Sequence, residues 1–182
     1  MIRTIGLIEL NSIARGIQVA DEMIKSAEVE LLLAKTVCPG KYIILVTGNV
    51  GAVQAAISHG EAAGREAVVN KLLVPNVHPQ VIPAINAASN VEKLRDLGVL
   101  EFFSIASAIV AADAAAKSAN VELIEVRLGV GIGGKAFITL TGDISSVNNA
   151  VTVGANTALE SGLLVNKAVI SAPSKELLQS LL

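Results

Sequence analysis

Short apolar runs alternate with longer amphipathic stretches along the first half of the chain. Ile5–Leu10 is an apolar run that ends at Asn11-Ser12, a pair suited to capping a helix. Apolar residues then recur at helical spacing from Ile13 to Ala27, while charged residues lie on the other faces. Val29–Val37 is again a strand-like run. The pattern therefore predicts a strand, a helix and a second strand.

The same pattern continues with a turn and a returning strand. Cys38-Pro39-Gly40 has the composition of a turn, and Tyr42–Val46 follows it as an apolar run. Asn49 is placed to cap a second helix, and Ala67–Val74 predicts a fourth strand, followed by a proline-punctuated tail with a short helix. The predicted order, β-α-β-β-α-β, is that of ferredoxin-like folds.

The second half of the chain repeats the first. Residues 6–31 align with residues 98–123 at an offset of 92, and 14 of the 26 positions are identical. The alignment resumes at an offset of 94 for residues 41–60 and at 96 for residues 68–74. One module has thus been duplicated and fused, which predicts an α/β (α+β) protein with one module in residues 1–90 and another in 91–182. Two such copies suggest a pseudo-twofold protomer and a ring of several protomers.

Composition excludes several classes of function. Apolar residues make up 52% of the chain and mean hydropathy is +0.62, yet no run approaches the ~18–20 apolar residues of a spanning helix. A net charge of −2 and 2% aromatic residues provide neither a basic stripe nor stacking side chains for nucleic acid. We therefore expect a soluble intracellular protein that binds neither nucleic acid nor membrane, and that buries apolar surface between subunits.

A glycine-rich stretch resembles a phosphate-binding loop but lacks the context of one. Gly129–Lys135 satisfies both G-x-x-x-x-G-K and G-x-G-x-x-G. Phosphate binding by either motif needs a helix next, whereas the strand-like run AFITLTG follows, and Ala136 stands where a P-loop has Ser or Thr. The stretch is interpreted as a flexible loop between strands.

No set of catalytic residues stands out, so we expect no enzymatic activity. The two histidines have no carboxylate at ligand spacing and are interpreted as solvated or capping residues. Glu9 and Glu101 recur at the ends of equivalent strands, where we expect each to interact with the following helix N-terminus. Lys25 and Lys117 each follow an aspartate by four residues, which is typical of a modest surface ion pair.

Cys38 marks the largest difference between the copies. It precedes Pro-Gly at the tip of a predicted turn, whereas the second copy has no cysteine there and a loop two residues longer. A single cysteine forms no disulfide within its chain and binds no metal tightly by itself. Two interpretations remain open: a free thiol, or a metal site shared by the same turn of several chains at a symmetry axis.

The amino-acid sequence resembles the shell domains of bacterial microcompartments. The matching segments are GLIELNSIARGIQVADEMIKSAEVELL, its echo GVLEFFSIASAIVAADAAAKSANVELI, then GGKAFITLTGDISSVNNAV and the closing GLLVNKAVI. The likeness covers essentially the whole chain. Two fused copies resemble the tandem-domain shell proteins, which form pseudohexameric trimers that tile a protein shell around enzymes in the cytoplasm. The resemblance implies a homotrimer and other shell proteins as partners.

One element, AKTVCPGKY (residues 34–42), is similar to the propanediol-utilisation branch of this family. In that branch, the cysteine of three subunits holds an iron–sulfur cluster at the central pore. The resemblance implies one [4Fe–4S] cluster per trimer, with three Cys38 ligands and a fourth ligand that is not cysteine. Pro39, Gly40 and Lys41 would shape the ligand loop, with Lys41 offsetting cluster charge. Electrons would then cross the shell to or from a redox enzyme inside or outside it.

The resemblance also assigns further residues. Gly131, Ile132, Gly133, Gly134 and Lys135 would form a second loop near the axis, and Lys25 and Lys117 would lie at the tile edge. The family's edge arginine, in a P-R-P-H-like segment, is absent from both Pro75-Asn76-Val77-His78 and Ser171-Ala172-Pro173-Ser174. Two alternatives stay open: a tile with an open metabolite pore and no cluster, and an oligomeric ligand-sensing module or enzyme on the same fold.

Overall fold

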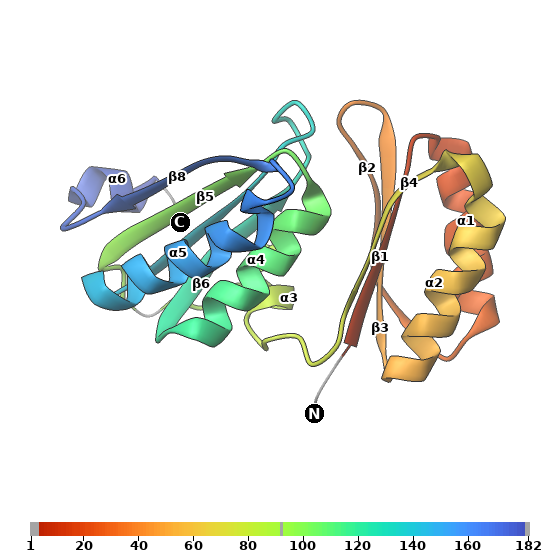
Figure 1. The fold of residues 1–182 in the computed structure, drawn as a ribbon, viewed down its shortest axis with the longest axis horizontal. Helices are drawn as coiled ribbons and strands as arrows, with labels where there is room; N and C mark the ends of the chain where they lie inside the picture. The colour runs from red at the N-terminus through yellow and green to blue at the C-terminus, as the bar shows by residue number, and fades with distance from the viewer. Residues whose placement is uncertain (1–3, 92, 181–182) are drawn as a thin grey trace. The chain divides into compact units, whose positions relative to one another are not determined.

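The computed structural model describes residues 4–91 and 93–180, which form two compact units. The first unit ends at Val77 and the second begins at His78. Each unit contains one four-stranded sheet (Figure 1) and is described by itself. The expected division of the repeat between residues 90 and 91 stays a prediction; in the structure, residues 78–91 belong to the second unit.

The first unit has the predicted β-α-β-β-α-β order. Its antiparallel sheet has the strand order β2-β3-β1-β4, and α1 and α2 cover one face of it (Figure 1). The elements are β1 (Thr4–Leu10), α1 (Ile13–Ser26), β2 (Glu30–Val37), β3 (Lys41–Gly48), α2 (Val50–Gly64), the 3-10 turn η1 (Arg65–Ala67) and β4 (Val68–Val74).

The second unit repeats this topology and adds two short helices. Its sheet has the order β6-β7-β5-β8, with α4 and α5 on one face. The elements are α3 (Val81–Ile85), β5 (Asp96–Phe102), α4 (Ile105–Ser118), β6 (Val121–Leu128), β7 (Ala136–Gly142), α5 (Ile144–Leu159), β8 (Leu164–Ile170) and α6 (Lys175–Gln179). The fold class predicted from the duplicated pattern is confirmed.

Each of the four long helices begins with a polar cap, as the sequence predicts for the two helices of the first unit. The cap side chain accepts a hydrogen bond from the backbone N–H three residues later, which satisfies one of the free donors of the first turn. The caps are Ser12, Asn49, Ser104 and Asp143. The backbone N–H of Ser146, joined by its hydroxyl, lowers the pKa of Asp143 below its ordinary value. Across the described residues, no helix has the length and apolar character needed to cross a membrane.

The core of the first unit lies between the helices and the sheet. It is built from the alternate positions of the central strands and one stripe of each helix, as strand and helix periodicity require. The members are Ile8 and Leu10 of β1, Ile44 and Val46 of β3, Val19, Ala20 and Met23 of α1, and Val53, Ala56 and Ile57 of α2. Burial of each large side chain contributes about 1.5–3 kcal/mol.

The two copies pack the first helix on the sheet in different ways. In the first unit Gly16 lies against Tyr42, and a Cβ at Gly16 would stand 2.6 Å from the Tyr42 Cβ. The repeat places Ala108 and Ala136 at the equivalent positions of the second unit, and both are fully buried. The large side chain of Tyr42 thus requires a glycine opposite it, whereas two alanines fill the same space in the second copy.

Replacement of Gly16 by alanine should therefore destabilise the first unit by about 1–3 kcal/mol, because the new methyl group overlaps Tyr42. On an unobstructed helix the same change would stabilise by about 0.5–1 kcal/mol, so the sign of the effect is informative. In the Tyr42→Gly background, which also removes the Tyr42 Cβ, Gly16→Ala should lose its penalty. Urea unfolding of the wild type, both single variants and the double variant measures this coupling. Additive effects would contradict the proposed contact.

Candidate functional site

Cys38 lies in the tight turn that joins β2 to β3. The strands close the turn with Val37 opposite Lys41, so only Cys38, Pro39 and Gly40 remain outside the ladder. Gly40 has a φ of +75°, which favours glycine, while Pro39 and Gly40 are exposed and Cys38 is half-buried. The turn predicted from Cys-Pro-Gly is confirmed.

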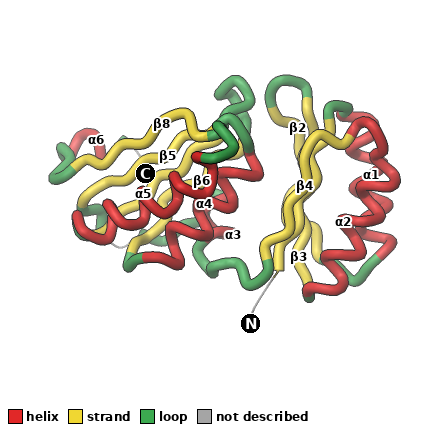
Figure 2. Tube along the Cα trace, viewed as in Figure 1, coloured by secondary structure: helices red, strands yellow, loops and turns green. Residues whose placement is uncertain are grey.

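The equivalent connection in the second unit is a longer loop (Figure 2), and its sequence is rich in glycine. Residues 129–135 join β6 to β7, and four of its glycines, 129, 131, 133 and 134, have positive φ. A Cβ at Gly131 or Gly133 would meet no atom within 4 Å. Strand β7 begins at Ala136, directly after Lys135. The predicted strand-to-strand loop is confirmed, and no helix follows that could present its N-terminus to a phosphate.

Each loop ends in a lysine that pairs with a glutamate of the central strand. Lys41 Nζ lies 2.9 Å from Glu9 Oε1, and Lys135 Nζ lies 2.5 Å from Glu101 Oε1. The expectation that Glu9 and Glu101 serve the helix N-termini was wrong, because Ser12 and Ser104 cap those helices. A β-sheet brings the lysine beside the glutamate although about thirty residues separate them in sequence.

The two ion pairs differ in burial. The Glu9 side chain is 5% exposed and that of Lys41 is 32% exposed, whereas Glu101 and Lys135 are 33% and 41% exposed. Lys41 therefore forms its ion pair with a buried carboxylate beside the Cys38 turn. Because Glu9 already neutralises the Lys41 ammonium group, Lys41 is less available to offset the charge of a cluster.

Lys25 and Lys117 form the predicted pairs within their helices. Lys25 Nζ lies 2.5 Å from Asp21 Oδ2, and Lys117 Nζ lies 2.6 Å from Asp113 Oδ2. The first pair is exposed, but Asp113 is 11% exposed and its Oδ1 also accepts a hydrogen bond from the His78 backbone N–H at 2.7 Å. Asp113 is thus a structural link as well as an ion-pair partner.

The described residues contain neither a metal site within one chain nor an evident catalytic pair. Between residues 4 and 180, position 92 aside, no three His, Cys, Asp or Glu side chains gather closely enough to hold a metal ion. His59 Nδ1 lies 3.0 Å from the Ala55 carbonyl oxygen of its own helix, and His78 Nδ1 accepts a hydrogen bond from the Gln80 N–H. A metal held by Cys38 would need ligands from other chains.

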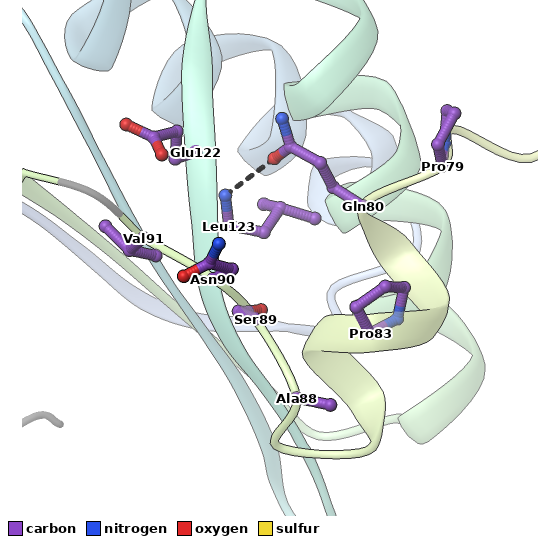
Figure 3. Close-up of a pocket in the computed structure, with 9 residues that line it drawn as sticks. All are labelled: Pro79, Gln80, Pro83, Ala88, Ser89, Asn90, Val91, Glu122 and Leu123. Atoms are coloured by element: carbon purple, nitrogen blue, oxygen red, sulfur yellow. Dashed lines mark hydrogen bonds between the residues drawn. The ribbon is translucent and has the colours of Figure 1, made fainter.

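A residue that the sequence pattern did not single out is Gln80. It lies beside a cavity of about 270 Å³, lined by Pro79, Gln80, Pro83, Ala88, Ser89, Asn90, Val91, Glu122 and Leu123 (Figure 3). Its side-chain amide bonds to the backbone of β6 at two points. The signal that could have identified it is its place in the segment after β4, which has a counterpart after β8.

Comparison with known proteins gives consistent matches over nearly the whole chain. The BMC domain matches twice, at residues 4–77 and 96–173. The chain is 46% identical to the bacterial microcompartment shell protein PduT of Citrobacter freundii, over 97% of this chain and 96% of that protein. A crystal structure of a microcompartment protein from Desulfitobacterium hafniense superposes with a TM-score of 0.94 at 52% identity, covering 98% and 99% of the two chains.

A more distant structure supports the fold alone. A fused permuted hexameric shell protein of the RMM microcompartment gives a TM-score of 0.64 at 22% identity, covering 87% of this chain and 84% of that one.

The two loop-end ion pairs provide a matched test of burial. Lys41→Met should destabilise the protein by about 1–3 kcal/mol, because it leaves the buried Glu9 carboxylate without its partner. Lys135→Met should cost no more than about 1 kcal/mol, since Glu101 remains accessible to water. Denaturant unfolding of both variants gives the comparison. Equal losses would show that the difference in burial has no energetic consequence.

Proposed function

The chain belongs to the BMC-domain family of bacterial microcompartment shell proteins, with two copies of the domain, and from this premise we propose that three chains form a pseudohexameric tile holding one [4Fe–4S] cluster. As a structural shell protein similar to PduT, it acts by assembly with other shell proteins rather than by catalysis.

The number of modules supports a trimer. A hexagonal tile needs six equivalent positions, and three chains with two modules each supply them. The apolar content of 52% supports burial between subunits as well as within them. Exposed apolar side chains on the first unit, such as Ile17 and Leu31, are available for such contacts.

The position of Cys38 is the observation that carries the cluster proposal. It is the one cysteine in the sequence, and it lies in a three-residue turn whose other members are exposed. A thiolate is the ligand that iron–sulfur clusters use, and a threefold axis would bring three identical turns together. A single chain offers one such ligand, so the site is complete only in the assembly.

The residues around Cys38 suit a rigid ligand loop. Pro39 restricts the backbone and Gly40 supplies the left-handed turn, so the thiol is held by a short connection between two paired strands. A bound cluster supplies one-electron transfer across the tile. Three thiolates leave one iron position for a ligand that is not cysteine, such as water.

An open metabolite pore is the second candidate. The loop at residues 129–135 favours it, since Gly131 and Gly133 are exposed, adopt a positive φ that favours glycine, and have open space where a side chain would stand. In that case Cys38 is a plain thiol and the glycine loops line the passage. Iron binding separates this function from the cluster.

Cys38→Ser should abolish iron binding and leave the trimer intact. After anaerobic reconstitution, the wild type should carry about four irons per trimer with matching sulfide, and the variant none. Light scattering should give three times the 18.7 kDa chain mass for both. Thr36→Ser, on the exposed end of β2, is the matched control and should keep its iron. Equal iron in wild type and Cys38→Ser would refute the cluster, and a stable monomer would refute the trimer.

Lys25→Ala combined with Lys117→Ala should prevent extended sheets without affecting the trimer. The exposed Lys25–Asp21 pair contributes only about 0.3–0.5 kcal/mol to its helix, but an edge contact repeats throughout a lattice, so its loss accumulates. Electron microscopy of concentrated protein measures sheet formation. Lys71→Ala removes a comparable exposed pair with Glu61 and should still form sheets. Normal sheets in the double variant would show that Lys25 and Lys117 form surface pairs only.

A further inference from the structure

The segment that follows β4 docks on the second unit. His78 donates its backbone N–H to Asp113 of α4 at 2.7 Å, which holds the start of the segment. Helix α3 then packs on β6 and α4, and its residues Val81 and Ala84 are completely buried. Together these contacts fix residues 78–85, here called the docking segment, against the α4–β6 edge.

Gln80 satisfies the backbone of the edge strand. β6 is the outermost strand of its sheet, so one side of its backbone lacks a partner strand. The Gln80 amide nitrogen donates to the Val121 carbonyl at 3.2 Å, and its oxygen accepts from the Leu123 N–H at 2.8 Å. Figure 3 shows the side chain directed at this strand. One amide thus replaces two ladder bonds of a neighbouring strand.

The second copy of the repeat carries the same segment without its contacts. At an offset of 96, Asn76 corresponds to Ala172, and both have a positive φ, of 53° and 47°. Gln80 then corresponds to Glu176 and Val81 to Leu177. Val81 is completely buried, but Leu177 is 38% exposed, and Glu176 is exposed as well. Residues 174–180 therefore have the form of a docking segment, and Glu176 and Leu177 are left exposed in their own unit.

The first unit carries the complementary surface, also exposed. At an offset of 92, Asp21 corresponds to Asp113 and Leu31 to Leu123. The Asp21 side chain is 60% exposed against 11% for Asp113, and Leu31 is 40% exposed against 2% for Leu123. Ile17 is 56% exposed, whereas its counterpart Ile109 is completely buried.

The edge strands of the two surfaces also share their irregularity. β2 has a register shift between Leu31 and Leu33, and β6 has one between Leu123 and Glu125, at equivalent positions. The backbone irregularity beside the docking segment in β6 therefore recurs at the equivalent place in β2.

We infer that residues 174–180 of one copy dock on the α1–β2 edge of a second copy, in the way that residues 78–85 dock on α4–β6. Asp21 then accepts the backbone N–H of Ser174 in the partner, and Leu177 covers Leu31. The contact is head-to-tail, which is the kind of contact that builds a closed trimeric ring when the rotation between copies is threefold. This inference rests on the proposed trimer and names the surfaces that form it.

One difference between residues 78–85 and residues 174–180 changes the number of hydrogen bonds in the contact that each forms. Glu176 can accept the Leu31 N–H as Gln80 accepts that of Leu123, but an ionised carboxylate has no hydrogen for the Val29 carbonyl. The contact between copies therefore has one hydrogen bond fewer than the contact within the chain. Glu176→Gln restores it in each of the three contacts of the ring and should lower the trimer dissociation constant by about fivefold per contact, the effect of one typical hydrogen bond.

Dissociation of the trimer on dilution measures these effects. Leu177→Asp should raise the dissociation constant by at least about tenfold, because it places a charge in an apolar contact. Val50→Asp, at an exposed apolar position of α2, is the matched control and should leave the constant unchanged. If Glu176→Gln and Leu177→Asp leave a trimer that dissociates as the wild type does, the inference is wrong while the trimer stands.

Cross-linking locates the contact. Glu30→Cys with Glu176→Cys, in the Cys38→Ser background, should give covalent dimers and trimers with a short bismaleimide. The equivalent pair, Glu122→Cys with Gln80→Cys, removes the two hydrogen bonds of Gln80 and should link within one chain. Links between chains for the first pair support the inference. If the first pair links only within one chain, or not at all while the control pair reacts, the segment docks elsewhere; a wild type that is monomeric by light scattering would instead refute the trimer itself.

Discussion

Unpaired backbone at the sheet edge is the constraint around which the second unit is organised. A four-stranded sheet leaves one side of β6 without a strand partner. The unit meets this constraint with Gln80, whose amide bonds to β6 at two points, while Val81 and Ala84 cover the apolar surface beside it. Asp113 accepts a hydrogen bond from the backbone N–H of His78 at the start of the segment, and it also forms an ion pair with Lys117. The placement of the cavity at residues 79–91 follows from this docking.

Much of the fold could be predicted because its signals are local and appear twice. Helical spacing, polar caps and Cys-Pro-Gly define elements whose observed bounds differ from the predicted ones by a few residues. The duplication confirms each assignment independently. What the pattern missed depends on the sheet register: Glu9 and Lys41 are separated by about thirty residues in sequence and become neighbours only when β1 pairs with β3. Gln80 was missed for a similar reason, since its partners lie about forty residues away.

The positions at which the copies diverge show how one fold accommodates two sets of contacts. The same space between helix and strand is filled in two ways. The second copy uses one alanine on each element, Ala108 and Ala136, whereas the first copy has no side chain on the helix, at Gly16, and a large one on the strand, at Tyr42. The short Cys38 turn and the longer glycine loop lie at equivalent ends of their sheets. The two connections differ in length and in glycine content, so the backbone of the first is more restricted than that of the second. In both copies the loop-end lysine is retained and paired with a glutamate. The scaffold is thus held constant while the surfaces change.

The docking of residues 78–85 has a kinetic consequence for any ring built from these chains. In a ring of separate modules every contact is bimolecular, and its formation slows as the protein is diluted. Covalent fusion turns alternate contacts into intramolecular ones, for which a short linker provides an effective concentration on the order of millimolar. A fused chain therefore enters assembly with half of the contacts already made. Dilution then weakens only the contacts between chains, and formation of a ring requires three chains to meet instead of six separate modules.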